Sequence, residues 1–473
     1  MRERTEELYQ SRLRRYVTAM RNGMPDRVPI RPFAAEAAAR HAGLTCQDVT
    51  QDYRQAFEAV IRCAKDYPWD AVVPNMVAMW AGVPQALGLK YFGVPGVELS
   101  PDVCFQYREP AEAQALMKRD EYEELIDDPT RFLYHRWLPR AIGDECESQA
   151  SYRRTVGLVK AGIAMQDYFR AFGPHIERLR SEFGMPPAFC GMLRAPLDML
   201  ADKFRGYIGL MLDLHEVPEK VVAACQSLMR HLGYLALTGA DPQGLLPVPF
   251  WMHRTCVPFI SKCHFETIFW PTTRPIVEAL WAQGNQVLFY AEGKWDSHLE
   301  RFAELPDGSI IFHIDRTDPH RAREVLSGRF CLSGGVPNTL LAFGTPSDVR
   351  SHCRKLIETL GAEGGYILDA SAIMQNDTTP ENLRAMTDAA FDYGVYSVAN
   401  TNGGPVVAAA PSHRIALPDW IGAGVNSPGV CVAWEERMAE LPPLSGKPAL
   451  VRSVWEEVDS HAYHFIWNLL LCF

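Results

Sequence analysis

The amino-acid sequence predicts an α/β protein built on a single (β/α)8 (TIM) barrel, with a helical extension before the barrel, an insertion after its second strand and an extension behind it. Three observations predict this fold. Short apolar runs end at turn signals, as strands do when both faces of a parallel sheet are covered. Helical patterns alternate with these runs, and eight strand candidates follow one another along the chain. Several runs end in ionisable residues, at the end of a barrel strand where this fold carries its chemistry.

The composition is that of an ordinary globular protein, with 473 residues, 47% hydrophobic and 22% charged. A net charge of -10 argues against a surface for nucleic acid or anionic lipid. No apolar run reaches the ~18 residues of a membrane span, and the amino terminus lacks the apolar stretch of a signal peptide. Twelve cysteines without a C-x-x-C pair suit free thiols in a reducing compartment. We therefore expect a cytoplasmic protein that binds neither nucleic acid nor a membrane.

The amino-terminal part follows the expected rhythm. Its elements are a helix over 4–22, a strand over 28–33, a helix over 49–66 and a strand over 70–74. Asn22-Gly23 stops the first helix, so we assign residues 1–24 to an N-terminal helix. The prolines of the first strand favour a position at the end of a barrel. Asn75 directly follows the second strand.

The rhythm breaks over about 80–187, where proline, glycine and acidic residues are frequent. A long helical pattern runs from Leu158 to Phe183, and Gly173-Pro174 should kink it or divide it in two. We interpret this region as an insertion that lies over the barrel rather than as a separate domain.

Strands and helices then alternate to the end of the barrel, which we expect to span 25–395. The remaining strand candidates are 189–193, 244–250, 287–291, 310–314, 330–333 and 366–368. Helices are expected near 197–212 and 217–238, and Ser261 is expected to cap the next one, which Pro271 perturbs. The last two helices have the clearest starts, because Thr345 and Thr379 suit N-caps and each is followed by proline.

The C-terminal extension, 396–473, is less regular and rich in glycine and proline. Its end, 464–473, is apolar but too short to cross a membrane. We expect it to pack on the body of the protein or on a partner chain, and the second alternative predicts a homodimer.

Short motifs recur in a fixed order between about residues 10 and 395. They are Pro25–Pro29, Glu121–Leu125 with Asp128-Pro129, Leu138–Arg140, Ala195–Asp198 with Arg205-Gly206, Glu292–Trp295, Gly334–Asn338 with Gly344–Pro346, Gly364–Leu368, and Pro380–Asn382 with Tyr393-Gly394. In number and order these motifs resemble the uroporphyrinogen decarboxylase-like superfamily. The resemblance implies a (β/α)8 barrel, in agreement with the independent strand count.

The superfamily divides in its chemistry. One branch decarboxylates uroporphyrinogen without a cofactor, and an Arg-Gln-Ala-Gly-Arg motif near its first strand holds the substrate carboxylates. The corresponding stretch here, Ile30–Ala35, keeps only Arg31. The resemblance therefore does not imply decarboxylation of uroporphyrinogen itself.

A second branch moves methyl groups between corrinoid proteins and other acceptors, using zinc bound by a His-x-Cys after the fifth strand and a Cys after the eighth. Here these positions read Tyr290-Ala-Glu292 and Asp369–Ala372, so the usual zinc triad is absent. Glu292, Asp315 or Asp369 with His253 or His313 could form an oxygen-rich replacement. The closest resemblance is to a subgroup with Glu-Gly-x-Trp in place of the zinc motif, near corrinoid-dependent methyl transfer.

The catalytic candidates are Glu292, His253, His313 and Asp315. Glu292 is read as a general base or metal ligand at the barrel mouth, or else as a salt-bridge partner. His313 and Asp315 share one side of their strand and could be an acid/base pair, a ligand pair or a structural hydrogen-bonded pair. His253 follows the fourth strand and is either functional or structural.

The remaining candidates concern binding. Asp369 ends the eighth strand, and the tentative metal set is Glu292, His253 and Asp369. Arg194 could bind an anionic substrate or pair with Asp198. The other residues expected to contact substrate are Asn75, Asn338, Tyr290 and Trp295.

Three functional hypotheses remain open. The first is a methyltransferase or demethylase subunit that passes a methyl group between a small molecule and a corrinoid (cobalamin). The sequence lacks the Asp-x-His-x-x-Gly signature of a corrinoid-binding domain, so the corrinoid would be carried by a partner protein or bind as a free molecule. The second is a cofactor-free decarboxylase of another carboxylated substrate, held by Arg194, Arg254 or Arg31. The third is a non-catalytic scaffold of a methyl-transfer complex, favoured if the polar strand ends are mutually paired and no pocket is open.

Overall fold

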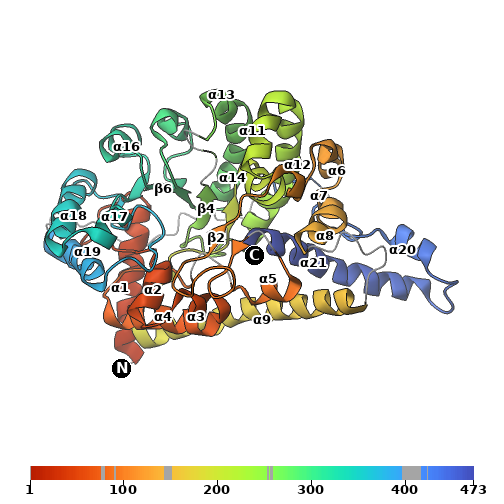
Figure 1. Cartoon of the computed structure of the whole chain (residues 1–473). Coiled ribbons are helices and arrows are strands. Elements are labelled where there is room, and N and C mark those ends of the chain that lie inside the picture. Colours follow the sequence, from red (N-terminus) through yellow and green to blue (C-terminus); the bar gives the residue numbers. More distant parts are fainter. Residues whose placement is uncertain are drawn as a thin grey trace.

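Figure 1 shows a ring of helices around a central sheet, with one long helix along its lower side and two helices that extend to the right. The computed structural model describes residues 2–75, 80–89, 92–142, 152–252, 255, 259–396, 417–422 and 424–473. Among these residues, no helix combines the length and the apolar composition needed to cross a bilayer.

The central sheet contains six parallel strands in sequence order. They are β3 (Leu193–Arg194), β4 (Val248–Met252), β5 (Val287–Ala291), β6 (Ile310–Ile314), β7 (Cys331–Gly334) and β8 (Tyr366–Ile367). The register places Tyr290 beside Trp251 on one neighbouring strand and beside His313 on the other. Ser333 follows beside His313. Side chains on one face of four consecutive strands therefore meet at one level of the sheet.

Two more segments close the sheet into a barrel. Ile30 pairs in parallel with Leu368, and Val72 pairs in parallel with Pro187, just before β3. The Asp70 amide donates to the Ile30 carbonyl, so the two segments are also neighbours of each other. The predicted (β/α)8 barrel is thus confirmed, with the first and second strands supplied by short bridges. The predicted strands 287–291 and 310–314 match β5 and β6, whereas the fourth strand lies a few residues later than predicted.

The helices surround this barrel. Before and within the insertion they are α1 (Arg2–Met20), α2 (Ala35–His41), α3 (Cys46–Gln51), α4 (Tyr53–Asp66), α5 (Gly82–Leu87), α6 (Tyr122–Asp127), α7 (Pro129–Phe132), α8 (Leu138–Ala141) and α9 (Tyr152–Phe183). Within the barrel they are α10 (Pro196–Met199), α11 (Tyr207–Glu216), α12 (Pro218–Gly239), α13 (Lys262–His264), α14 (Trp270–Ala282), α15 (Leu299–Phe302), α16 (Pro319–Leu326), α17 (Asn338–Phe343), α18 (Pro346–Leu360) and α19 (Pro380–Tyr393). The C-terminal extension adds α20 (Trp434–Glu440) and α21 (Pro448–Cys472).

Shorter elements complete the chain. A small antiparallel pair, β1 (Phe92–Gly93) and β2 (Gln106–Tyr107), lies in the insertion. The π-helical turns are η3 (Leu133–Trp137), η4 (Leu200–Phe204) and η5 (Phe265–Phe269), and the 3-10 turns are η1 (Glu112–Gln114), η2 (Arg119–Glu121) and η6 (Asp296–His298). The η5 turn directly precedes Pro271 in α14, which agrees with the perturbation expected there.

The predicted helix starts are confirmed. Thr345 accepts a hydrogen bond from the Asp348 amide, and the Asp348 carboxylate accepts one from the Thr345 amide, which makes a capping box. Thr379 caps α19 and Ser261 caps α13 through the same kind of side-chain contact.

Several predictions about helices were wrong in part. The expected helix over 49–66 is two helices, α3 and α4, because Asp52 leaves the helical conformation and caps α4. The helix expected near 197–212 is interrupted at Arg205-Gly206, between η4 and α11. Of the two alternatives for Gly173-Pro174, the division does not occur, because α9 continues through Pro174, and the kink stays a prediction. His175, the next residue, stacks on Phe57 at 4.1 Å and bonds the Pro74 carbonyl, so packing against the barrel offsets the hydrogen bond that proline removes.

The expectation of a less regular C-terminal extension was also wrong in part, because its last part is the 25-residue helix α21. Its apolar end is buried in the same chain, and Trp467 stacks on His231 at 4.5 Å and donates to the Thr130 hydroxyl. Of the two alternatives for this end, packing on the body is therefore confirmed. The apolar end that suggested a homodimer is thus covered within the chain. The homodimer itself stays a prediction. The expected domain limits at 24 and 395 also stay predictions.

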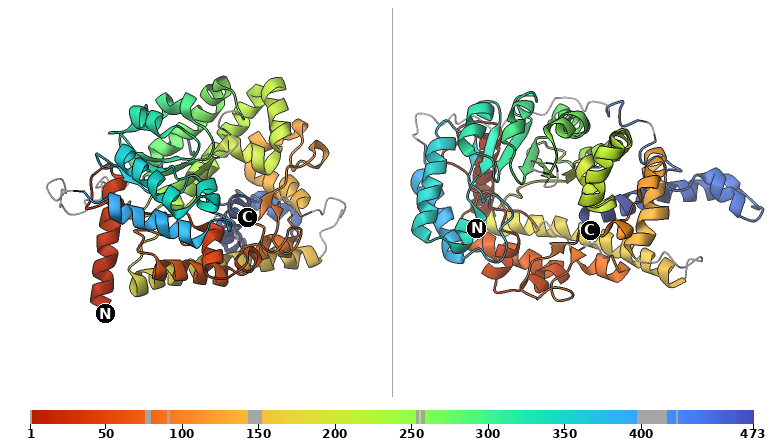
Figure 2. Two further views of the ribbon diagram at one scale, coloured as in Figure 1. Left: turned by 60° about the vertical axis from the view of Figure 1, so that its left-hand side comes forward. Right: turned by 45° about the horizontal axis from the view of Figure 1, so that its top comes forward.

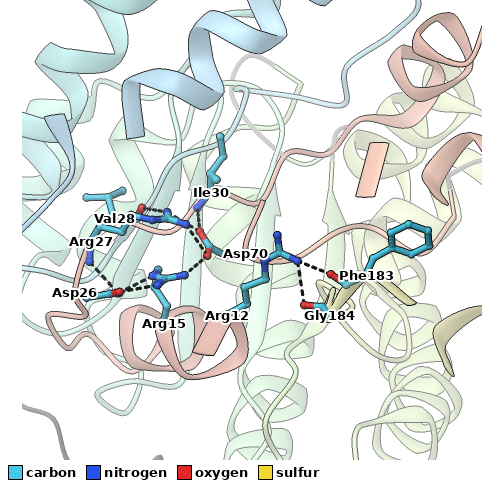
Figure 3. Close-up of polar contacts among 9 residues, drawn as sticks. All are labelled: Arg12, Arg15, Asp26, Arg27, Val28, Ile30, Asp70, Phe183 and Gly184. Atoms are coloured by element: carbon cyan, nitrogen blue, oxygen red, sulfur yellow. Dashed lines mark hydrogen bonds and ion pairs between the residues drawn. The ribbon is translucent and has the colours of Figure 1, made fainter. Parts of the chain in front are cut away.

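The amino ends of the first two strands are held by a buried ionic group that Figure 3 shows in close-up. The fully buried Asp70 carboxylate accepts from Arg15 on α1 at 2.6 Å, from Arg27 at 2.8 and 2.9 Å, and from the Ile30 amide at 2.9 Å. We call Arg15, Arg27 and Asp70 the foot cluster. Arg12, one turn earlier on α1, donates to the carbonyl of Phe183, the last residue of α9, and to that of Gly184, and so ties the end of this helix to the same part of the barrel.

Candidate active site

The inward-facing side chains near the carboxyl ends of the strands form a buried polar group. We call Arg31, Tyr290, His313, Ser333 and Asp369 the interior cluster; all five are fully buried. The first four come from the first, fifth, sixth and seventh strands, and Asp369 is the second residue after β8. The carboxyl end of the barrel is where catalytic residues of this fold lie, so the interior cluster has the location expected of a site.

Arg31 and Asp369 form the ionic part of the cluster. Arg31 NH2 lies 2.9 Å from Asp369 Oδ2, while Asp369 Oδ1 accepts from the amides of Phe33 and Ala370. Burial raises the pKa of Asp369 to about 6, even though the Arg31 guanidinium opposes this shift. Nε and NH1 of Arg31 have no hydrogen-bond partner among the described residues. The pair is thus only partly satisfied.

His313 is held in one orientation by its neighbours. Nε2 lies 3.1 Å from the Ser371 carbonyl, which can only accept, so Nε2 carries the proton. Nδ1 then accepts from the Ser333 hydroxyl at 2.9 Å. Burial and the nearby Arg31 guanidinium hold the pKa of His313 well below its ordinary value. The imidazole is therefore neutral and both of its nitrogens are engaged.

Tyr290 stacks on this imidazole, with ring centroids 4.1 Å apart, and packs against Trp251 at 4.5 Å. Burial and the Asp369 carboxylate raise the pKa of Tyr290 well above its ordinary value, so its hydroxyl stays protonated. Neither the Tyr290 hydroxyl nor the Trp251 indole N–H has a partner among the described residues. Buried groups of this kind are usually hydrogen-bonded, so both are candidates for contact with a ligand or water.

Glu292 and Asp315 lie in the turns that follow β5 and β6. Asp315 does not pair with His313, because its carboxylate accepts from the Gly293 amide at 2.6 Å, and burial raises its pKa. Gly293 has a φ of +89°, a conformation that suits glycine. The half-buried Glu292 is therefore displayed by a turn that Asp315 fixes.

Trp295 lies outside the barrel wall rather than at its mouth. Its ring packs on Phe289, at 5.5 Å, and on Phe302, both in the layer between β5 and the helices. Its indole N–H donates to the Glu292 carbonyl at 2.9 Å. The Glu-Gly-x-Trp segment thus builds the Glu292 turn, and Trp295 lies apart from the other candidates.

Two further candidates, Arg194 and Asn338, have structural partners. Arg194 pairs with Asp202 at 3.0 Å, rather than with the expected Asp198. Asn338 donates to the Ile373 carbonyl and accepts from the Ala372 amide, which joins the loops after β7 and β8. Their roles toward substrate stay predictions, as do those of all the site residues.

A cavity of about 670 Å³ lies beside the interior cluster, between the second, third and fourth strands and the helices α9 and α21. We call it the inner cavity. Its walls include Asn75, which donates to the Tyr168 hydroxyl, together with Phe189 and Trp251. No arginine, lysine, aspartate or glutamate lines it among the described residues.

The described residues do not fit a zinc ion. No three of their His, Cys, Asp or Glu side chains gather closely enough to hold a metal. His313 uses both nitrogens and Asp369 both oxygens in the contacts above. His253 lies outside the described residues, so the tentative set of Glu292, His253 and Asp369 stays a prediction.

Sequence reasoning missed several members of this region. Arg31 was considered only as a remnant of a carboxylate-binding motif, yet it is the cation of the interior cluster. Ser333 and Trp251 were hidden in apolar strands, although their alternation with outward-facing neighbours was a usable signal. The inner cavity could not be foreseen, because α9 and α21 come from distant parts of the chain.

Comparison with known proteins agrees with the fold. Residues 164–393 match the family model described as Uroporphyrinogen decarboxylase (URO-D). A solved structure, a methyltransferase from Methanosarcina mazei, superposes with a TM-score of 0.53 and 12% identity, over 81% of this chain and 98% of that one. No curated protein matches the chain in sequence. At this identity the likeness to the solved structure concerns the fold alone. Residues 164–393 are thus similar to the uroporphyrinogen decarboxylase family, and the fold of the chain is that of a uroporphyrinogen decarboxylase-like barrel.

Proposed function

We propose that this protein is a methyltransferase or demethylase subunit that moves a methyl group between a small molecule and a corrinoid, which a partner protein carries or which binds free. The observation that carries the proposal is the uncharged, aromatic wall of the inner cavity next to the interior cluster. Methyl-bearing groups are compact and apolar, and such a wall suits them. The similarity of the whole barrel to a methyltransferase supports the same choice.

The decarboxylase alternative receives less support. A carboxylated substrate needs cations at its binding site. Arg31 is paired with Asp369, and Arg194 is paired with Asp202. The third candidate, Arg254, lies outside the described residues. The scaffold alternative predicts paired strand ends without a pocket. The inner cavity does not favour it, and neither does the Trp251 N–H, which has no partner in the part of the chain that the structure describes.

In the proposed reaction the bond between the methyl carbon and its substrate atom breaks, and the bonding electron pair stays on that atom. The corrinoid, when bound, supplies the methyl acceptor or donor. Glu292, half-buried after β5, is the proposed acid or base; because it does not line the inner cavity, the reacting atom of the substrate has to extend from the cavity past Tyr290 to reach it. The neutral His313 holds the ring of Tyr290 in place by stacking, and Tyr290 in turn supports Trp251 in the cavity wall.

The test is methyl transfer to and from methylcobalamin by the wild-type chain and by Glu292→Gln. Loss of a general acid or base reduces the rate by about 10²–10⁴-fold. The matched control is Glu300→Gln, a glutamate on exposed α15 that pairs with Arg321, and it should leave the rate unchanged. An unchanged rate in Glu292→Gln would remove Glu292 from the reaction. Release of CO2 from a carboxylated substrate, without methyl transfer, would replace the proposal by the decarboxylase alternative.

Elemental analysis of the purified chain and of Glu292→Ala tests the metal question separately. A near-stoichiometric divalent ion that is lost in the variant would identify Glu292 as a ligand. An equal metal content in both proteins would leave Glu292 as an acid or base.

A further inference from the structure

A second hollow lies next to the inner cavity. A groove of about 800 Å³ runs between α9 and α21, and we call it the outer groove. It shares the lining residues Phe169, His464 and Asn468 with the inner cavity, so the two hollows are adjacent and these three side chains lie between them. Both views of Figure 2 show α9 extended along one side of the barrel. A ligand that passed between these three side chains would approach Trp251 from the side of the barrel that α9 and α21 cover.

The barrel wall allows this side route. Among the described residues, the second strand meets the third only at the bridge between Val72 and Pro187, and β3 itself begins at Leu193. The intervening Phe189 packs on Phe33 and Trp251 inside the barrel and also lines the inner cavity. The inner cavity therefore reaches inward-facing side chains through the gap between these two strands.

The lining selects the chemistry of a ligand. Several aromatic rings line the inner cavity: Tyr168, Phe169 and Phe172 on α9, and Phe189 and Trp251 on the barrel. Rings of this kind stack against a flat ring of a ligand. Because no charged side chain among the described residues lines the inner cavity, an ionised ligand would lose its hydration without a counter-charge.

One polar group in this wall lacks a partner. Trp251 is 5% exposed, and its indole N–H has no hydrogen-bond partner among the described residues. A buried indole N–H usually finds an acceptor. Within the lining, an acceptor atom of a ligand would complete this hydrogen bond.

We propose that the inner cavity binds an uncharged, ring-containing molecule whose acceptor atom meets the Trp251 N–H, and that this molecule enters between α9 and α21. The identification of this molecule as the substrate rests on the proposed function. The site itself does not, because binding can be measured without turnover.

The first experiment is calorimetric titration of the full chain with methoxybenzene, toluene and 4-methoxybenzoate. Methoxybenzene has a ring and an acceptor, toluene lacks the acceptor, and the benzoate adds a charge. We expect methoxybenzene to bind about tenfold more tightly than toluene, the effect of one buried hydrogen bond. The charged probe should bind at least about tenfold more weakly than methoxybenzene. Equal or tighter binding of the benzoate would overturn the assignment of an uncharged ligand.

Trp251→Phe keeps an aromatic ring but removes the N–H. In this variant the preference for methoxybenzene over toluene should disappear. The matched control is Trp270→Phe, because the Trp270 N–H is also buried without a partner, but its ring packs on Phe265 and Phe302 outside the barrel. If Trp251→Phe kept the full preference, the N–H would not contact the ligand and the proposal would fail.

The entrance is tested by Gly162→Phe in the outer groove. A Cβ at Gly162 meets Phe465 at an ordinary 3.6 Å, so the backbone tolerates a side chain that then fills the groove. The association rate of methoxybenzene, measured by stopped-flow tryptophan fluorescence, should fall at least about tenfold. Gly157→Phe is the control on the same helix, because nothing lies within 4 Å of a Cβ there. A wild-type rate in Gly162→Phe would rule out the side route.

Two outcomes separate this inference from the proposed function. Binding of methoxybenzene at Trp251 without methyl transfer to or from methylcobalamin would retain the site and refute the proposed function. Methyl transfer by a chain that binds no uncharged aromatic probe would retain the proposed function and refute the site.

Discussion

The foot cluster and the interior cluster each contain a fully buried aspartate beside arginine, but they differ in how completely it is satisfied. Both Asp70 oxygens have good partners, from two guanidinium groups and one amide. In the interior cluster two nitrogens of Arg31 and the Tyr290 hydroxyl have no hydrogen-bond partner among the described residues. A saturated group at the amino ends of barrel strands suits stability, whereas unused hydrogen-bonding capacity at the carboxyl ends suits ligand binding.

Asp70→Asn should have the largest effect on stability. It leaves Arg15 and Arg27 buried beside each other without the carboxylate that neutralises them. The free energy of unfolding in guanidinium chloride should fall by about 3–5 kcal/mol. Asp26→Asn is the control, because Asp26 also bonds Arg15 but its side chain is 60% exposed, and it should cost less than about 1 kcal/mol. Equal losses in the two variants would contradict a special role for the foot cluster.

The double variant Arg31→Met with Asp369→Asn should change activity strongly and stability little. The asparagine keeps an acceptor for the Phe33 and Ala370 amides, and the partly satisfied ion pair is removed as a unit. The stability should stay within about 1 kcal/mol of wild type, because a buried pair recovers little more than its desolvation cost. Methyl-transfer activity per folded molecule should fall about 100-fold through loss of positioning. A stability loss as large as that of Asp70→Asn would erase the contrast between the clusters.

His313 makes the interior cluster sensitive to acid. Its folded pKa is lowered, so below its ordinary pKa of 6.5 the unfolded chain binds a proton that the folded chain does not. The stability that comes from keeping His313 neutral is complete above pH 6.5. It is lost as the pH falls, by up to about 1.4 kcal/mol per pH unit. In His313→Gln the free energy of unfolding, measured between pH 7.5 and 4.5, should fall less steeply with pH by this amount. The exposed His320 on α16 is the control position, and an unchanged slope in His313→Gln would mean that other groups determine it.

Asn338→Ala should have the smallest effect. Its two hydrogen bonds join neighbouring loops and do not reach the inner cavity, so we expect a loss of about 1 kcal/mol in stability and little change in activity. Removal of the Thr345 cap by Thr345→Ala, away from the barrel mouth, should cost about the same. A large loss of activity in Asn338→Ala alone would show that the carboxyl-end loops contain more of the site than the interior cluster.

The sequence predicted those parts of the fold whose signals are local. The runs 287–291 and 310–314 form β5 and β6, whose two faces are both buried. Thr345 and Thr379 cap their helices because their hydroxyls accept an amide hydrogen bond, and the proline after each suits the first helical position. The continuity of α9 through Pro174 was not predictable in the same way. It depends on His175 contacting Phe57 and Pro74, which lie far away in the sequence.

The candidate site shows the same limit. Tyr290 and His313 occupy paired positions on the adjacent strands β5 and β6, so the strand pattern predicts that they are neighbours. Their rings stack on each other. Whether Asp315 turns toward His313 or toward the Gly293 amide depends on the shape of a loop, and the strand pattern carries no information about it. Trp295 was expected in the mouth because its motif is there, but a large apolar ring gains more from the layer of phenylalanines outside β5.

The single bridge between the second and third strands also has a consequence for the way the chain folds. The pairs from β3 to β8 join neighbours in sequence, whereas Val72 meets Pro187 only across the whole insertion, and Ile30 meets Leu368 across nearly the whole barrel. Closing such long loops costs chain entropy before stabilising contacts form, so these pairings form slowly. The six-stranded sheet should therefore form first, and the first two strands with α1 should dock late. In a pulsed hydrogen-exchange experiment the amides of Leu368 and Ala188 should become protected after those of β5 and β6.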